Sequence, residues 1–110
     1  MNKKVIFGQI GRLKTDKIQD YESLHAQPWI EVMNVLHSGN LQNYSIFREG
    51  TLVFSYYEYI GDDYEADMEK MGKDESMQRW LSLTRPCFEE FGIRSDSIYY
   101  ADMKQLFFLA

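Results

Sequence analysis

Two residues with useful proton chemistry, Tyr21 and His25, stand four positions apart in the first quarter of the chain. On a helix this spacing puts two side chains next to each other, so that they can address the same small volume. Histidine titrates near neutral pH and can give or take a proton, whereas a tyrosine hydroxyl donates and accepts hydrogen bonds without ionising. The spacing alone also fits a structural pair, with the histidine at the domain edge and the tyrosine on the core, and by itself it favours that interpretation.

Three other aromatic residues could contact a ligand. Trp80 could stack its ring on the apolar face of a sugar, but its helical spacing from Met77 and Thr84 equally predicts core packing. Tyr44 lies in a strand-like run and could either point into a cavity or pack across strands. Trp29 is predicted to be a core anchor. The residue types alone leave the roles of Trp80 and Tyr44 open.

The sequence lacks the motifs of metal, phosphate-binding and nucleophilic sites. The chain has two histidines, His25 and His37, and no cluster of ligands at metal-binding spacing. It has no glycine-rich phosphate-binding motif. A nucleophilic pair of Cys87 and His25 has no local support, because Cys87 falls in an apolar helical pattern that predicts a buried, inert thiol. A structural zinc site is therefore not expected, and nucleotide binding has no motif support.

The composition limits the domain organisation and the partners. A chain of 110 residues predicts a single domain over residues 1–110. A net charge of −5 makes nucleic acid and anionic membranes poor partners. No apolar run is long enough to cross a bilayer, and the N-terminal segment lacks the cleavage site of a secretory signal. With one cysteine and so no intrachain disulfide, the sequence fits the cytoplasm.

The first half of the chain reads as strand, interrupted helix and hairpin. Residues 4–13 predict a strand, and Thr15 or Asp16 is expected to cap the helix that follows. Pro28 should either kink this helix or end it and restart it with proline at the first position. Residues 41–60 predict two strands around a turn at residues 49–50, and their alternation predicts two distinct faces.

The second half reads as two helices and a strand. One helix is expected from residues 62–63 to Gly72, a second from residues 74–76 to Gly92, and a strand over residues 96–110. The order β, α, β, β, α, β predicts an α+β fold, a ferredoxin-like four-stranded antiparallel sheet with helices on one face. Because the strands carry large apolar residues on both faces, we expect a second copy of the chain to cover the other face.

Taken together and in order, the motifs of the chain resemble the L-rhamnose mutarotase family. The resemblance covers nearly the whole chain and rests on Tyr21-x-x-x-His25 with Trp29 and Glu31, Asn43-Tyr44-Ser45-Ile46, Leu52-x-Phe54-x-x-x-Glu58, Gln78-Arg79-Trp80 and Leu106-Phe107-Phe108-Leu109. It implies a homodimer of ferredoxin-like protomers that forms a dimeric α/β barrel, the last strand contributing to the partner's sheet.

The resemblance also implies an activity, a cofactor-free isomerase that interconverts the α and β anomers of a 6-deoxy-L-hexopyranose. His25 matches the family's proton-donating histidine, and Tyr21, Tyr44 and Trp80 match its sugar-contacting positions. Our mechanistic hypothesis gives His25 the proton transfer at the ring oxygen and leaves the second transfer to Tyr21 or a water molecule. Under this interpretation the Tyr21 and His25 pair is catalytic rather than structural.

Two departures from the family pattern concern the substrate. The family commonly has a second tryptophan where this chain has Leu81, and its proline follows the tryptophan that Pro28 here precedes. L-rhamnose is the expected sugar and L-fucose the alternative. Two other classes stay open because this fold hosts many functions. One is a non-catalytic sugar-binding module, and the other is a cofactor-free or haem-dependent monooxygenase of the same dimeric build, with His25 as base or axial ligand.

Overall fold

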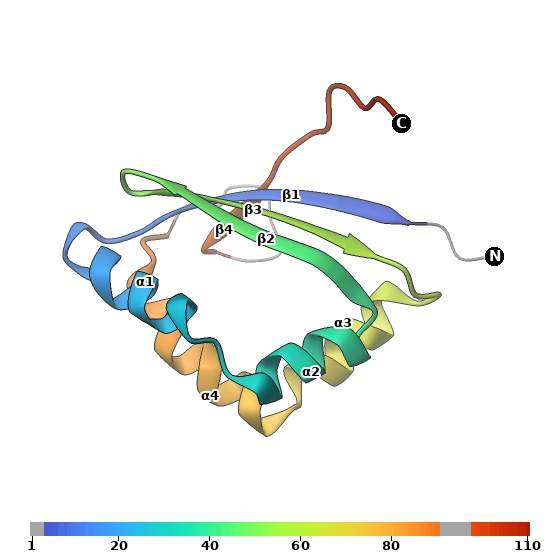
Figure 1. Ribbon diagram of the computed structural model, residues 1–110, viewed down its shortest axis with the longest axis horizontal. Helices are drawn as coiled ribbons and strands as arrows, with labels where there is room; N and C mark the ends of the chain where they lie inside the picture. The colour runs from blue at the N-terminus through green and yellow to red at the C-terminus, as the bar shows by residue number, and fades with distance from the viewer. Residues whose placement is uncertain (1–3, 91–97) are drawn as a thin grey trace.

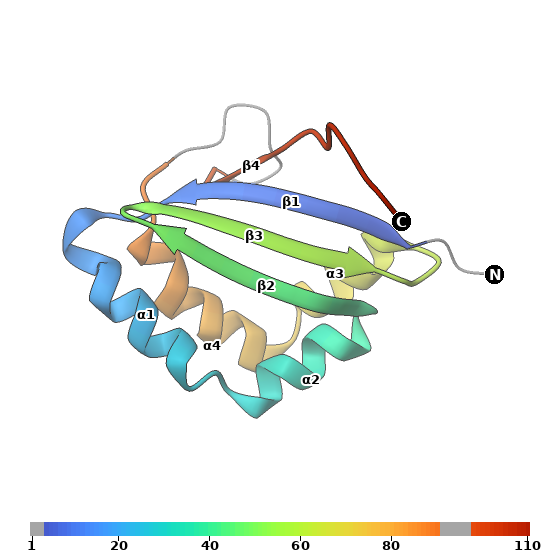
Figure 2. The same cartoon turned by 45° about the horizontal axis from the view of Figure 1, so that its top comes forward.

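The sheet of the computed structural model has four strands in the order β2-β3-β1-β4, and each adjacent pair is antiparallel. The structure describes residues 4–90 and 98–110. Its elements are β1 (Val5–Arg12), α1 (Ile18–Ala26), α2 (Ile30–Ser38), β2 (Leu41–Glu49), β3 (Leu52–Tyr59), α3 (Tyr64–Gly72), α4 (Glu75–Thr84) and β4 (Tyr100–Asp102), with 3₁₀ turns at Thr15–Lys17 and Arg85–Cys87. All four helices lie on one face of the sheet (Figures 1 and 2), which confirms the predicted ferredoxin-like architecture.

The hairpin of β2 and β3 forms as predicted, with Gly50 in the turn at a φ of 60° that suits glycine. Ile46 lies opposite Ser55, and Arg48 lies opposite Val53. Since directly opposed residues share a face, and Val53 and Ser55 are buried under the helices, Ile46 and Arg48 belong to the helix side of the sheet. The opposite side of the hairpin carries Phe47 and Phe54.

The helix starts follow side-chain caps in the second half of the chain. The carboxylates of Asp63 and Asp74 accept hydrogen bonds from the backbone N–H groups of Ala66 and Met77, which fixes the first turns of α3 and α4. The prediction that Thr15 or Asp16 caps the first helix is wrong. These residues form a 3₁₀ turn, and no side chain caps α1.

Both prolines end helices earlier than the apolar pattern predicts. α1 stops at Ala26 and α2 starts at Ile30, so Pro28 stands in the link and not at the first helical position. The helix predicted to reach Gly92 ends at Thr84, because Pro86 has no N–H to continue it. Phe88 is extended and forms a bridge with Leu13, while Gly92 lies outside the described residues.

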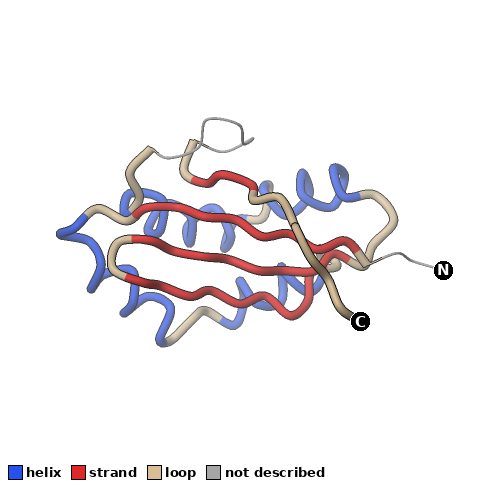
Figure 3. Tube along the Cα trace, turned by 90° about the horizontal axis from the view of Figure 1, so that it is seen from above, coloured by secondary structure: helices blue, strands red, loops and turns tan. Residues whose placement is uncertain are grey.

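The last strand is much shorter than predicted. Only Tyr100–Asp102 pairs with β1, and one further hydrogen bond joins the N–H of Met103 to the carbonyl of Gly8. The remaining tail crosses over the strands on the side away from the helices (Figure 3), and Leu106 keeps 87% of its surface exposed. Four consecutive apolar residues, 106–109, do not alternate, so the pattern does not fix one buried face for this segment.

The core is divided into three clusters. One surrounds Leu13 and Val53 beneath one end of the sheet, one joins Val32 to Met77 between α2 and α4, and one surrounds Tyr59 at the opposite end. The division of the core matters for function because a cavity lies between the clusters.

Among the described residues, no helix is long and apolar enough to cross a membrane.

Candidate functional site

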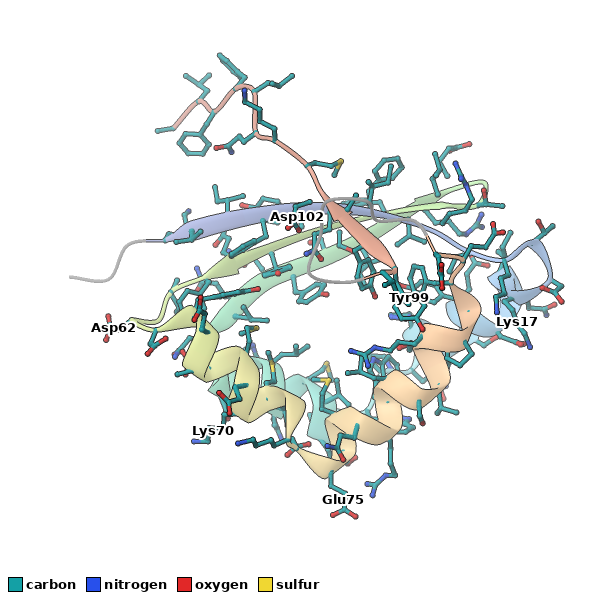
Figure 4. The ribbon with its side chains drawn as sticks, turned by 180° about the vertical axis from the view of Figure 1, so that it is seen from behind. Lys17, Asp62, Lys70, Glu75, Tyr99 and Asp102 are labelled. Carbon is teal, nitrogen blue, oxygen red and sulfur yellow. The ribbon has the colours of Figure 1, made fainter. Side chains whose placement is uncertain are left out.

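A cavity of about 500 Å³ lies between the helix side of the sheet and helices α1, α2 and α4. Its size is in the range of small-molecule sites. Figure 4 shows side chains from the two layers pointing toward each other across this space. The lining residues are Tyr21, His25, Pro28, Val32, Met33, Leu36, His37, Leu41, Gln42, Asn43, Tyr44, Ile46, Ser55, Met77, Trp80, Leu81, Thr84 and Tyr100. All four predicted site residues are among them.

Tyr21 and His25 lie side by side on α1, with ring centroids 4.2 Å apart. Nδ1 of His25 donates a hydrogen bond to the carbonyl oxygen of Tyr21 at 2.8 Å. Since a carbonyl can only accept, Nδ1 carries a proton and Nε2 is the nitrogen left to exchange one. Pro28 ends the helix directly after this pair, so the ring of His25 stands at a helix end and not under a further turn.

Burial keeps His25 neutral. Loss of solvent lowers the pKa of the imidazole below its usual 6.5, and the hydrogen bond to the Tyr21 carbonyl offsets this only in part. No carboxylate is among the residues that line the cavity, so none of them stabilises an imidazolium there. At neutral pH, Nε2 of His25 therefore carries a lone pair that can accept a proton.

Trp80 forms part of the wall and part of the core. Its ring meets His25 edge to face at 5.2 Å and Trp29 edge to face at 5.3 Å. Trp80 is buried, and Trp29 packs against the same cluster from outside the cavity, as predicted for a core anchor. Trp80 thus holds His25 from one side while it presents apolar ring surface to the cavity.

Tyr44 reaches the cavity from β2, where the strand is irregular. The register shifts between Gln42 and Ser45, and Asn43 has a φ of 50°. The amide groups of Gln42 and Asn43 both donate to one carboxylate oxygen of Glu58 on the other side of the sheet, at 2.9 and 2.8 Å. The bulge is thereby anchored, and the ring of Tyr44 lies on the helix side, stacked at 5.0 Å on the ring of Tyr57.

Tyr100 is a cavity residue that the sequence did not reveal. It lies opposite Gly11 in the pairing of β4 with β1, on the helix side of the sheet. The signal in the sequence is the pair of adjacent tyrosines, Tyr99 and Tyr100. Successive side chains of a strand point to opposite faces, so only one of the two can face the cavity. The pairing register decides which one faces the cavity, and the sequence does not contain it. Figure 4 labels Tyr99 next to this position.

The three phenols of the cavity are unpartnered hydrogen-bond donors. The hydroxyls of Tyr21, Tyr44 and Tyr100 have no hydrogen-bond partner among the described residues. Burial raises the pKa of all three, and the mutual repulsion of their ionised forms raises those of Tyr21 and Tyr44 further. The phenols are therefore protonated in the free protein at neutral pH, where they are hydrogen-bond donors for a ligand.

The other groups considered at the sequence level lie elsewhere or at the rim. Cys87 is buried in the cluster around Leu13, outside the cavity, and burial raises the pKa of its thiol. His37 lines the cavity from the exposed last turn of α2. Within residues 4–90 and 98–110, no three histidine, cysteine or acidic side chains gather as metal ligands would.

The fold and the cavity define a class, small α+β proteins in which a small-molecule site lined by phenols and imidazoles lies between the sheet and its helices. The sequence model of the L-rhamnose mutarotase family matches residues 7–109. Because this match spans nearly the whole chain, the protein belongs to the L-rhamnose mutarotase family.

One individual relative agrees with this assignment in sequence, and two solved structures share the fold. An L-rhamnose mutarotase of Bacillus subtilis strain 168 is 33% identical over 97 residues, which cover 86% of this chain and 88% of the relative. The crystal structure of the L-rhamnose mutarotase FA22100 from Formosa agariphila superimposes with a TM-score of 0.72 at 17% identity, covering 96% of this chain and 99% of that one. A putative antibiotic biosynthesis monooxygenase from Nitrosomonas europaea shares the fold at a TM-score of 0.59, 12% identity, and coverage of 82% and 84%.

Proposed function

We propose that this protein interconverts the α and β anomers of L-rhamnose by acid and base catalysis at the cavity. The observation that carries the proposal is that one cavity brings together the neutral imidazole of His25, free at Nε2, and phenols that have no hydrogen-bond partner among the described residues. A sugar presents many hydroxyl groups, and phenols and an imidazole can donate to them or accept from them. The family membership supports the same activity.

The reaction needs two proton transfers and a rotation. One proton leaves the anomeric hydroxyl, and one reaches the ring oxygen as the bond between that oxygen and C1 breaks. C1 of the open aldehyde then rotates, and the ring closes on its other face with both transfers reversed. Positioned acids and bases accelerate such a reaction by about 10²–10⁴-fold.

His25 takes the first proton. Its lone pair at Nε2 accepts the proton of the anomeric hydroxyl, and the Tyr21 carbonyl holds Nδ1–H in both charge states. This role differs from the sequence-based hypothesis, which gave His25 the proton transfer at the ring oxygen. A neutral imidazole in this tautomer has no proton at Nε2 to donate to that oxygen. The imidazolium formed on opening is the proton donor on closing, and this step corresponds to the donor role that the family resemblance implies.

Tyr21 supplies the second transfer. Its ring lies 4.2 Å from that of His25, so its hydroxyl can address the same end of the sugar. A phenol whose pKa is raised by burial stays protonated until the ring oxygen develops negative charge, and it then donates to that oxygen. When the ring closes, the phenolate recovers the proton, so the enzyme returns to its starting state.

The remaining wall fits a 6-deoxy sugar. Tyr44 donates to a hydroxyl from the sheet side, and Trp80 offers apolar surface to the C–H face of the ring. The C6 methyl group meets an apolar part of the lining made by Val32, Met33 and Leu36. A hexose with a 6-hydroxyl would have to bury that group there without a partner, which is costly.

The test is saturation-transfer NMR of anomer exchange with a panel of L-rhamnose, L-fucose and common hexoses. We expect exchange of L-rhamnose well above the buffer rate, and slower exchange of L-fucose and the hexoses. Binding of sugar with exchange at the buffer rate would instead indicate a non-catalytic sugar-binding module. Oxygen consumption with a phenolic substrate, without anomer exchange, would indicate a monooxygenase.

The proposal includes a homodimer built on the uncovered face of the sheet. This face carries Ile10, Phe47 and Phe54, and Phe47 keeps 64% of its surface exposed. The tail with Leu106 and Leu109 extends on the same side (Figure 3). Burying these groups against a second copy would remove a large apolar surface from water. Sedimentation should show a dimer at micromolar concentration, and a chain truncated after Met103 should show monomer; a monomeric parent would contradict this.

We place the activity in the cytoplasm. The thiol of Cys87 is buried and free, and it has no second cysteine with which to form an intrachain disulfide. A chain without disulfides suits a reducing compartment. Fractionation of cells that express the protein should recover it with the cytoplasmic markers, and recovery with the secreted fraction would contradict the assignment.

A further inference from the structure

Phe88 lies between two of the cavity phenols. Its ring meets Tyr21 edge to face at 5.2 Å and Tyr100 edge to face at 5.1 Å. One ring therefore fixes the positions of a phenol from helix α1 and a phenol from strand β4. Since Tyr21 also contacts His25, Tyr100 belongs to the end of the cavity where the proton chemistry is proposed.

The backbone is adapted to bring these rings together. A Cβ atom at Gly11 would lie 3.0 Å from Cε1 of Phe88 and 2.9 Å from the carbonyl oxygen of Tyr99. Both distances are shorter than ordinary contacts, so glycine at this position allows Phe88 and β4 to approach β1 closely. Tyr100 is the residue paired with Gly11, and this close approach brings it to the cavity wall.

The ring packing of Tyr100 does not need its hydroxyl group. A phenylalanine would make the same edge-to-face contact with Phe88, and no described residue bonds the Tyr100 hydroxyl. No fully buried side-chain N or O atom among the described residues lacks a partner, so the Tyr100 hydroxyl is accessible from the cavity and is free to donate to a ligand that displaces water there. Burial also keeps this phenol protonated by raising its pKa, so it is a donor.

We propose that Tyr100 is a substrate-binding residue that donates a hydrogen bond from its phenol to a hydroxyl group of the bound sugar. It approaches from the sheet, whereas Tyr21 and His25 approach from helix α1. The sugar is thus held from both layers at its reacting end. This inference rests on the proposed function only in taking a monosaccharide as the ligand.

The first test compares Tyr100→Phe with the matched variant Tyr64→Phe. Both remove one phenol oxygen, but Tyr64 lies on α3 and does not line the cavity. Loss of one neutral hydrogen bond should raise the KM of Tyr100→Phe for L-rhamnose by roughly 3- to 10-fold. Its melting temperature should stay close to that of the parent, and the KM of Tyr64→Phe should not change. An unchanged KM for Tyr100→Phe would overturn the proposal.

The second test identifies the hydrogen bond with L-rhamnose analogues that each lack one hydroxyl group. The parent should lose affinity for the analogue that lacks the group bound by Tyr100, and Tyr100→Phe should bind this analogue and L-rhamnose equally well. Equal losses in both proteins for every analogue would overturn the assignment.

Ligand-observed NMR gives these affinities whether or not anomers exchange. Exchange at the buffer rate with the expected affinity pattern would reject the proposed activity and keep Tyr100 as a binding residue. Normal exchange, with the same affinities for every analogue in Tyr100→Phe as in the parent, would keep the proposed activity and reject Tyr100 as a binding residue. A parent that binds no sugar would reject both proposals.

Discussion

Tyrosines in two regions of this protein use their hydroxyl groups differently. Tyr21, Tyr44 and Tyr100 line the cavity, and their hydroxyls have no hydrogen-bond partner among the described residues. At the far end of the sheet and on α3, four tyrosines have partners: Tyr56 with Glu58, Tyr57 with Tyr64, and Tyr59 with Asp67. The same side chain therefore stabilises the fold where its hydroxyl is paired, and is available to a ligand where it is not.

The paired region is built around two carboxylates. Asp67 accepts from the hydroxyl of Tyr59 and from the amide of Asn40. Glu58 accepts from Tyr56 and from two amides of β2, and these hydrogen bonds lower its pKa to about 2. The cavity has no carboxylate in its wall, and burial keeps its phenols protonated and the imidazole of His25 neutral. The contrast shows how the chain separates groups that hold the fold from groups that meet a ligand.

Removing the imidazole should have the largest effect on activity. We expect His25→Ala to slow anomer exchange by about 10²–10⁴-fold, because the variant loses the imidazole that lies beside Tyr21 and accepts the anomeric proton. Saturation-transfer NMR of the folded variant measures this directly. Tyr64→Phe is the control, since Tyr64 lies on α3 and does not line the cavity. Exchange in His25→Ala at the parental rate would remove His25 from the mechanism.

Acidification should reduce activity through the same residue. Since burial lowers the pKa of His25 below 6.5, the imidazole is neutral at pH 7 and becomes protonated only at lower pH. The enzyme-catalysed rate should be flat near neutrality and fall by about tenfold per pH unit once the pH passes below that pKa. The pH profile of the exchange rate, with the buffer rate subtracted, tests this. A rate that rises on acidification would mean that the imidazolium acts first.

Breaking a paired phenol should affect stability and not exchange. Tyr59→Phe leaves Asp67 without one of its donors, and it also removes the acceptor of the Asp63 N–H. We expect the melting temperature to fall by roughly 5 °C, with exchange per folded molecule unchanged. Calorimetry and NMR on the same sample separate the two quantities. A variant with the parental melting temperature and slow exchange would show that Tyr59 serves the ligand and not the fold.

The smallest predicted effect is on the pH dependence of the free energy of unfolding, through Glu58. Its folded pKa of about 2 lies below the ordinary 4.5, so the folded state binds fewer protons than the unfolded state between these values. The contribution of ionised Glu58 to the free energy of unfolding is therefore present above pH 4.5 and is lost as the pH falls toward 2. Glu58→Gln should be less stable than the parent at pH 6, and the gap should narrow on acidification. A gap independent of pH would contradict this account of Glu58.

The local parts of the fold could be predicted from the sequence. The caps Asp63 and Asp74, the turn at Gly50 and the alternation of the hairpin are encoded within a few residues. The early end of α4 was missed because the apolar spacing continues past Pro86, although proline cannot continue the backbone hydrogen bonds.

The site could be predicted only in part. The adjacency of Tyr21 and His25 follows from their helical spacing, and the structure brings Tyr44 and Trp80 to the same cavity. Tyr100 could not be found, because its face depends on the register between β1 and β4. The protonation of His25 also depends on burial and on the absence of a carboxylate in the wall, and both are properties of the assembled layers.

The central claim is that the unpartnered phenols serve the sugar and the partnered phenols serve the fold. Its most direct test is the anomer exchange rate of L-rhamnose per folded molecule, measured below KM, for single Tyr→Phe variants at positions 21, 44, 100, 59 and 64. We predict that exchange falls at least threefold for the first three, most for Tyr21→Phe, and stays at the parental rate for the last two. Parental exchange in the three cavity variants, or slowed exchange in the other two, would contradict the account.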